Sequence, residues 1–178
     1  MKLLSQFMAA LAALLLALPA QGDKKKAAEN LEDARSAPGV VTGGLHAPQI
    51  KDKWLKGTHG NAGVVPAQVA KQLQGKGFNN FAEFRKAFWL AVAAVPELKK
   101  QFSPQNRALI EVGKAPYAAQ LQQKTGQPEY QLHHQKPVHA AGELYDLDNI
   151  VIVTPVFHAE VLAPSTHYGE KGKKGGKP

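Results

Sequence analysis

Two adjacent histidines, His133 and His134, lie inside a short segment that has the character of a β-strand. The segment, residues 130–135, reads YQLHHQ and is followed by a proline, Pro137. Neighbouring residues of a strand point to opposite faces of the sheet. The two imidazoles are therefore predicted to face different surroundings and to serve different purposes.

A second strand and a short helix follow this segment. Residues 149–153, rich in β-branched side chains, predict a strand, and Thr154 and Pro155 suit the cap and the first position of a helix. The helix carries a further histidine, His158. A hairpin packed on a helix brings His133 and His158 to one point in space, which is the arrangement that a metal site needs.

The residues before this hairpin predict helices. Pro66 and Pro104 suit first helical positions, Asn80 suits an N-cap with Glu83 as its capping-box partner, and Gly113 suits a C-terminal cap. An apolar stripe at helical spacing is formed by Phe81, Phe84, Phe88 and Val92. Burial in the core is the preferred interpretation of this stripe, and an exposed row that stacks on bases is the alternative. The fold class predicted is α+β, a mainly helical domain with a C-terminal ββα finger.

The two ends of the chain predict export and flexible tails. Residues 1–22 combine an early lysine with a short apolar run and small residues, which is typical of a secretory signal peptide. We expect residues 23–50 to be a flexible basic segment, residues 51–168 to be the folded domain, and residues 169–178 to be a disordered tail rich in Lys and Gly. The protein is accordingly expected to be secreted, with no stable membrane insertion.

Composition restricts the partner and the source of stability. The 178 residues suffice for one domain, and they contain no cysteine, so packing or a bound metal must replace disulfides. The formal net charge of +8 favours a polyanion such as nucleic acid or an anionic membrane surface, with solubility alone as the alternative.

The ordered series of segments GKAPYA, YQLHHQKP and LYDLDNIVIVTPVFH resembles the DNase domains of colicins and S-type pyocins, the HNH-endonuclease bacteriocin family. The similarity extends upstream through DKWL, VPAQVAKQL and GFNNFAEFRKAFW, and it covers about residues 51–162. The resemblance implies a ββα-metal fold and the hydrolysis of DNA phosphodiester bonds with one divalent ion, which could be Mg²⁺, Ni²⁺ or Zn²⁺.

The resemblance also assigns roles to single residues. It implies that His134 is the general base, that His133 and His158 are metal ligands, and that Asn149 holds the loop through hydrogen bonds to backbone groups. Gln131 stands where the family has a glutamate that orients the histidines.

Three positions depart from the family pattern. Leu162 replaces a third metal-binding histidine, Gln131 replaces the glutamate, and Gln127 replaces an arginine that helps to hold phosphate. Glu160 should point away from the site, and His167 lies beyond the end of the helix, so neither is an obvious substitute ligand. His139, His46 and His59 are expected to be ordinary exposed loop histidines.

Two functions remain open at this point. The first is a secreted antibacterial, metal-dependent DNA endonuclease, and the second is a degenerate relative that binds nucleic acid or a protein without cleaving. By the resemblance, residues 107–129 would carry the surface for a small acidic immunity protein, with Tyr117 as an aromatic anchor. We expect the chain itself to be a monomer.

Overall fold

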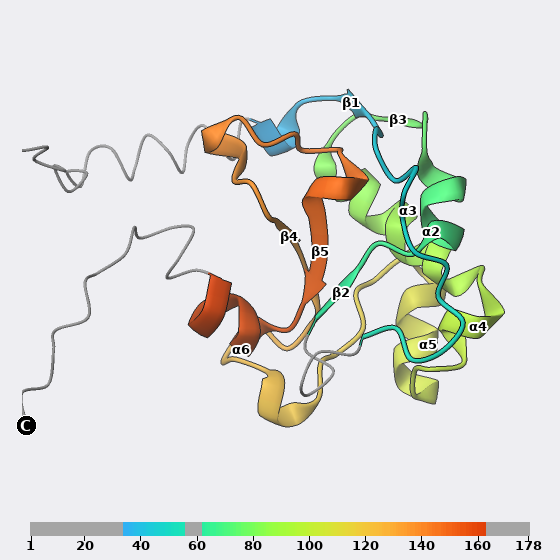
Figure 1. Cartoon of the computed structure of the whole chain (residues 1–178). Helices are drawn as coiled ribbons and strands as arrows, with labels where there is room; N and C mark the ends of the chain where they lie inside the picture. The colour runs from blue at the N-terminus through green and yellow to red at the C-terminus, as the bar shows by residue number, and fades with distance from the viewer. Residues whose placement is uncertain (1–33, 56–61, 163–178) are drawn as a thin grey trace, which may run out of the picture.

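The computed structural model describes residues 34–55 and 62–162, with side chains through Glu160. In this part of the chain, helices pack around two small antiparallel sheets, which confirms the α+β class (Figure 1). The strands are β1 Gly39–Val40, β2 Ala62–Val64, β3 Gly77–Phe78, β4 Gln131–His134 and β5 Ile150–Val153. The helices are α2 Ala67–Leu73, α3 Phe81–Ala93, α4 Pro96–Lys99, α5 Pro104–Glu111 and α6 Pro155–Phe157, with shorter turns η1 Gln120–Gln122, η2 Val138–Ala140, η3 Leu147–Asn149 and η4 His158–Leu162.

The predicted signal peptide and the predicted C-terminal tail lie outside the described residues. Within the described ranges, no helix has both the length and the apolar character needed to cross a bilayer.

Helix α3 begins where its capping residues predict. The Asn80 side chain accepts a hydrogen bond from the Glu83 N–H at 3.0 Å. The Glu83 carboxylate accepts in return from the N–H of Asn79 at 3.0 Å, one residue before the position used in a standard capping box. The start of the helix is confirmed, and its reciprocal bond is shifted by one residue.

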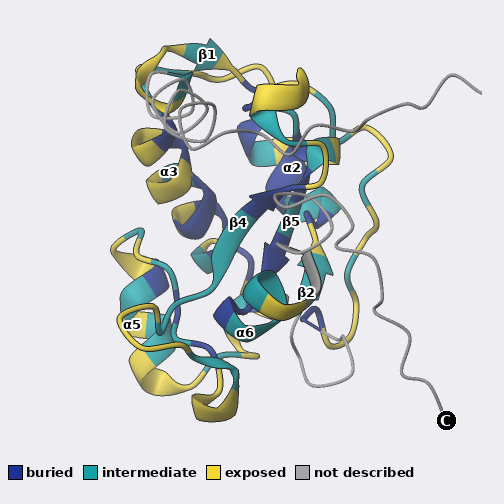
Figure 2. Cartoon of the chain, turned by 90° about the vertical axis from the view of Figure 1, so that its left-hand side faces the viewer, coloured by how far each residue is buried: buried dark blue, intermediate teal, exposed yellow. Residues whose placement is uncertain are grey.

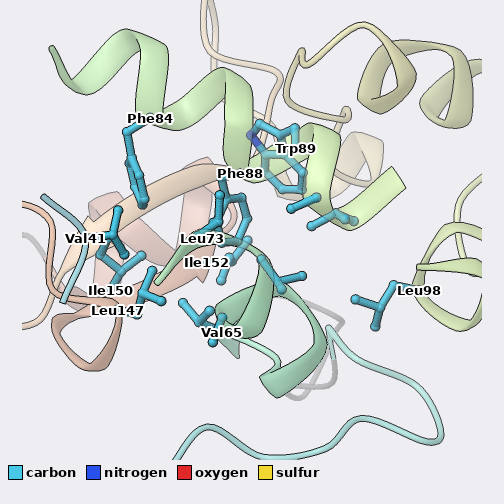
Figure 3. Close-up of a cluster of buried hydrophobic side chains, with 14 of the residues drawn as sticks. Val41, Val65, Leu73, Phe84, Phe88, Trp89, Leu98, Leu147, Ile150 and Ile152 are labelled. Carbon is cyan, nitrogen blue, oxygen red and sulfur yellow. The ribbon is translucent and has the colours of Figure 1, made fainter. Parts of the chain in front are cut away.

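The aromatic stripe of α3 lies at the centre of the core. Phe84, Phe88 and Val92 are fully buried and Phe81 is 4% exposed. The Phe84 and Phe88 side chains point from α3 toward Ile150 and Ile152 of β5 (Figure 3). Each such burial stabilises the fold by about 1.5–3 kcal/mol. The core interpretation of the stripe is confirmed, and a base-stacking row is excluded because these rings do not reach the surface.

The sheet that carries the histidines takes its third strand from the first half of the chain. Strand β5 lies between β2 and β4, antiparallel to both (Figure 1). In the hairpin, His133 is paired with Val151 and His134 with Ile150. Figure 2 shows β5 and the inner side of α3 as buried, and the outer side of α3 as exposed. The β4–β5 hairpin is therefore fixed on the helical core.

The folded domain begins earlier than predicted. Strand β1 pairs with β3, and Val41, in the segment expected to be flexible, is 2% exposed in the core. Two successive glycines, Gly43 and Gly44, have positive φ angles of 68° and 76° and turn the chain back. Residues 39–50 wrap around the domain mostly as irregular chain. Their apolar residues therefore follow neither the helical nor the strand repeat, and the sequence gives no sign that they are packed.

Three other helix ends agree with the sequence to within a residue. Pro66 is the N-cap of α2 and not its first residue. The Ser103 hydroxyl caps α5 by accepting from the Asn106 N–H at 3.2 Å, and Gly113 follows the helix with a φ of 76°. Local capping chemistry therefore sets both ends of α5.

Candidate active site

The paired histidines of β4 point in different directions. The ring of His134 packs against the ring of Phe81, with the centroids 5.3 Å apart. The ring of His133 faces that of His158, with the centroids 4.8 Å apart and the planes at 71°. Both residues of the pair are largely buried, with 6% and 7% exposure. The alternation along the strand thus separates the two imidazoles as the sequence predicted.

The start of α6 positions His158. The Thr154 hydroxyl accepts from the Phe157 N–H at 3.3 Å, and Pro155 occupies the first turn. The backbone N–H of His158 donates to the Thr154 carbonyl at 2.9 Å. The chain then continues into the π-helical turn η4, His158–Leu162. One tight helical turn therefore carries His158 from the end of β5 to the side of His133.

The hydrogen bonding of His134 selects a tautomer. Its Nε2 lies 2.9 Å from the Leu144 carbonyl oxygen. A carbonyl only accepts, so Nε2 carries the proton and Nδ1 of the neutral ring keeps a free lone pair. Burial lowers the pKa of His134, the bond to Leu144 opposes this, and the positive charge of Arg35 lowers the pKa further. The resulting neutral imidazole is the form in which histidine accepts a proton.

Asn149 ties together the loop between the two strands. Its side-chain oxygen accepts from the Lys136 N–H at 2.8 Å, and its side-chain nitrogen donates to the carbonyls of Lys136 at 3.0 Å and Glu143 at 3.1 Å. Gly142 lies in the same loop, where a Cβ atom would come 1.9 Å from the Lys136 carbonyl oxygen. The loop that contains Leu144, the partner of His134, is thereby held closely against β4.

A cavity of about 1030 Å³ opens beside these histidines. Its polar lining comprises Arg35, Ser36, Asn80, Arg85, Gln127, Glu129, Gln131, His133, His134, His139 and His158. The two arginines come from the N-terminal segment and from α3, and neither was singled out from the sequence. Arg35 lies in the segment expected to be flexible, and Arg85 is one of three charged residues on the polar side of α3, so no local pattern marks them. His139 is exposed, as expected of a loop histidine, and it also lines this cavity.

The two glutamines that depart from the family pattern contact each other. The Gln131 Nε2 donates to the Gln127 Oε1 at 3.2 Å, and both side chains line the cavity. The structure therefore has a neutral amide pair where the resemblance implies a glutamate and an arginine.

The His133 and His158 pair has the spacing of two ligands to one ion. With metal–nitrogen bonds of about 2.0–2.1 Å and tetrahedral angles, two imidazole centroids are expected to lie roughly 5 Å apart. Within the described residues, no group of three His, Cys, Asp or Glu side chains could hold an ion. Glu160 is exposed, while the Leu162 side chain and His167 lie outside the described part. The residues fit an ion held by two imidazoles, with its other ligands supplied by solvent or substrate.

A β-hairpin and a helix that converge on paired histidines, fixed to a helical core, define the ββα class of HNH folds. The chain belongs to the Colicin/Pyocin-S2 DNase domain family, whose family model matches residues 39–164. This confirms the resemblance inferred from the sequence.

Curated relatives include whole bacteriocins. The chain is 36% identical over 149 residues to pyocin-S1 of Pseudomonas aeruginosa, covering 83% of this chain and 24% of the relative. It is 39% identical over 125 residues to colicin-E2 of Escherichia coli, covering 70% of this chain and 21% of the relative. The chain thus spans about a quarter of the length of these relatives.

Solved structures of two relatives share the fold. The pyocin AP41 DNase-immunity complex gives a TM-score of 0.65 at 38% identity, with 70% of this chain and 97% of that chain covered. The mutant nuclease domain of pyocin S8 with its cognate immunity protein gives a TM-score of 0.64 at 35% identity, with 70% of this chain and 99% of that chain covered. The similarity therefore spans nearly the whole domain of each relative.

Proposed function

We propose that this chain is a secreted, metal-dependent HNH endonuclease of the antibacterial toxin type, which hydrolyses DNA phosphodiester bonds. The observation that carries the proposal is the facing pair His133 and His158 beside a neutral His134, all lining one cavity with Arg35 and Arg85. Imidazole ligands, a proton acceptor and guanidinium groups are what metal-assisted phosphodiester hydrolysis requires.

The residues divide the chemistry between them. His134 accepts the proton of the attacking water at Nδ1, because Nε2 is held by the Leu144 carbonyl. His133 and His158 would hold one divalent ion, either Mg²⁺, Ni²⁺ or Zn²⁺. A bound ion would stabilise the negative charge that develops on the phosphate and on the leaving oxygen.

Other residues of the site bind and orient. Arg35 and Arg85 line the cavity, where their positive charges attract the phosphates of DNA. Because contacts to phosphate do not depend on the base sequence, we expect cleavage without sequence specificity. Asn149 keeps the loop in place through its three hydrogen bonds. Gln131 keeps its place beside the histidines through the bond to Gln127.

A small acidic immunity protein is the partner that we propose, by analogy with the two solved complexes of relatives. Residues 107–129 would form its docking surface. Tyr117 in this segment is held by Asn106, which donates to the Tyr117 carbonyl and accepts from its N–H, each at 2.9 Å. Leu121 is 90% exposed on the same segment, so an apolar contact is available there.

A degenerate, non-cleaving protein is the second candidate. The neutral pair Gln127 and Gln131 favours it, as does the leucine at position 162, because each change removes a charge or a ligand from the reaction site. The loss of one preorganised electrostatic group costs on the order of 100-fold in rate. In this case the protein would bind nucleic acid or a protein partner through the same surfaces.

Cleavage of supercoiled plasmid by the purified chain separates the two candidates. The assay adds Mg²⁺, Ni²⁺ or Zn²⁺ and compares the protein with His134→Ala and with His46→Ala, a change at an exposed histidine outside the cavity. Ion-dependent cleavage that disappears only in His134→Ala supports the endonuclease. Absence of cleavage with every ion, from folded protein that binds DNA, rejects the enzyme and leaves the binding protein.

A further inference from the structure

The Thr154 hydroxyl joins two elements that are far apart in the sequence. Its Oγ1 donates a hydrogen bond to the Gln122 Oε1 at 2.9 Å and accepts one from the Phe157 N–H at 3.3 Å. Gln122 belongs to η1, whereas Phe157 is the last residue of α6. The side chain of Thr154 therefore connects η1 to the helical turn that carries His158.

The burial of Thr154 makes its hydrogen bond to Gln122 important for the local structure. Thr154 is fully buried. A hydroxyl has one proton to donate, and leaving that proton without an acceptor in the protein interior is costly. With Gln122 as acceptor, the proton points toward η1 and a lone pair is directed at the Phe157 N–H. Without Gln122, the hydroxyl would have to turn toward another acceptor and could leave the cap.

Helix α6 depends strongly on its cap. It contains only three residues, and such a short helix has little stability of its own. His158 follows it directly and donates from its backbone N–H to the Thr154 carbonyl at 2.9 Å. Thr154 thus holds the turn through both its side chain and its backbone, and the placement of the His158 ring opposite His133 follows from this turn.

We propose that Gln122 is a positioning residue for His158. It orients the Thr154 hydroxyl, which fixes the first turn of α6 and so keeps the His158 ring 4.8 Å from the ring of His133. The inference rests on the proposed function only where it treats His158 as an ion ligand. The mechanical part, in which Gln122 holds the α6 turn through Thr154, stands on the hydrogen bonds alone.

Three substitutions in the full chain test the proposal. Gln122→Met keeps the length of the side chain and removes the acceptor, whereas Gln122→Glu keeps an acceptor oxygen. Gln120→Met changes an exposed glutamine of the same turn and serves as the control. The measurements are amide hydrogen exchange at Phe157 in the ion-free protein and the affinity for Ni²⁺ and Zn²⁺ by calorimetry.

We expect Gln122→Met to accelerate exchange at Phe157 and to weaken ion binding, each by about 2- to 10-fold, as the loss of one net hydrogen bond implies. Gln122→Glu should restore both values, and Gln120→Met should leave both unchanged. Rescue by the glutamate separates positioning from a general loss of stability, because both Gln122 variants change the same packing.

Two results would overturn the proposal. One is unchanged Phe157 exchange in Gln122→Met, which shows that the turn does not depend on Gln122. The other is accelerated exchange that Gln122→Glu fails to reverse, which shows that the acceptor is not the cause. If the unsubstituted protein binds no ion, the proposed function fails instead, and the exchange measurement still decides the role of Gln122.

Discussion

The imidazole rings of His133 and His158 lie 4.8 Å apart and edge to face, although one comes from strand β4 and the other from the turn after α6. The strand register and the helix cap together produce this proximity. His133 is paired with Val151 in the hairpin, and Thr154 turns the chain immediately after β5. The first prediction follows from this pair.

Removal of either ring should abolish tight ion binding. His133→Ala and His158→Ala each take away one of only two imidazole ligands, so we expect the affinity for Ni²⁺ or Zn²⁺ to fall by about 100-fold or more. Isothermal titration calorimetry measures this loss, with the exposed His46→Ala as the matched control. An affinity that stays the same in either variant would place the ion elsewhere. Chelation with EDTA should also stop any plasmid cleavage.

Loss of the Asn149 side chain should loosen the loop that supports His134. Asn149→Ala removes three hydrogen bonds, and we expect the free energy of unfolding to fall by about 1–3 kcal/mol. Asn149→Asp should be at least as damaging, because a carboxylate cannot donate to the Lys136 and Glu143 carbonyls. Urea denaturation measures both effects.

A matched control for the loop is Gln135→Ala. The side chain of the exposed Gln135 donates one hydrogen bond, to the Asp148 carbonyl at 3.2 Å, so its removal should change the free energy of unfolding by less than about 0.5 kcal/mol. Equal effects of Asn149→Ala and Gln135→Ala would mean that Asn149 does not hold the loop.

Stability should decrease as the pH falls below the ordinary histidine pKa. Burial lowers the pKa of native His134 below its usual value of 6.5, and Arg35 adds to this, while the bond to Leu144 opposes it. Between 6.5 and the native pKa, the unfolded chain therefore binds a proton that the native protein does not. This contribution of His134 to stability is complete above pH 6.5 and is lost as the pH falls through the native pKa.

The measurement is urea unfolding of the ion-free protein between pH 8 and pH 5, beside His134→Asn. The difference between the two proteins isolates His134 from the other histidines and should shrink toward low pH. A difference that is independent of pH, or an NMR titration that places His134 above 6.5, would contradict the prediction.

The glutamine pair should be replaceable by an ion pair. Because the Gln131 and Gln127 amides lie 3.2 Å apart, Gln131→Glu combined with Gln127→Arg places a carboxylate within reach of a guanidinium at the cavity wall. We expect the double variant to cleave plasmid about 10-fold faster or more, since a fixed positive charge then faces the phosphate. Each single variant should raise the logarithm of the cleavage rate by less than half of the increase seen in the double variant. Additive single effects would show that the two positions act independently.

The sequence predicts those parts of the molecule that local chemistry determines. The N-caps Asn80 and Thr154, Pro104 at the start of α5, the stripe of α3 and the β-branched run of β5 all produce patterns within a few residues. The approach of His133 to His158 could also be predicted, because His133 lies on the strand that pairs with β5 and His158 lies on the turn directly after β5. These features need no knowledge of distant packing.

The remaining features depend on long-range packing. Arg35 reaches the cavity, Val41 enters the core and Gln122 meets Thr154 only because segments distant in the sequence come together. No periodicity or spacing marks such contacts in a single chain. For the same reason the packing of residues 39–50 into the domain leaves no local pattern in the sequence.

Because β5 lies between β2 and β4, the hairpin that carries the histidines depends on a strand from outside the hairpin to complete its sheet. Strand β2 comes from the N-terminal half and covers the side of β5 that the hairpin leaves open, with register pairs from Ala62 with Val153 to Val64 with Val151. A fragment that holds only the hairpin and α6 would expose this edge of β5 to other strands and invite self-association. Any transfer of these histidines to another scaffold therefore has to include a strand that replaces β2.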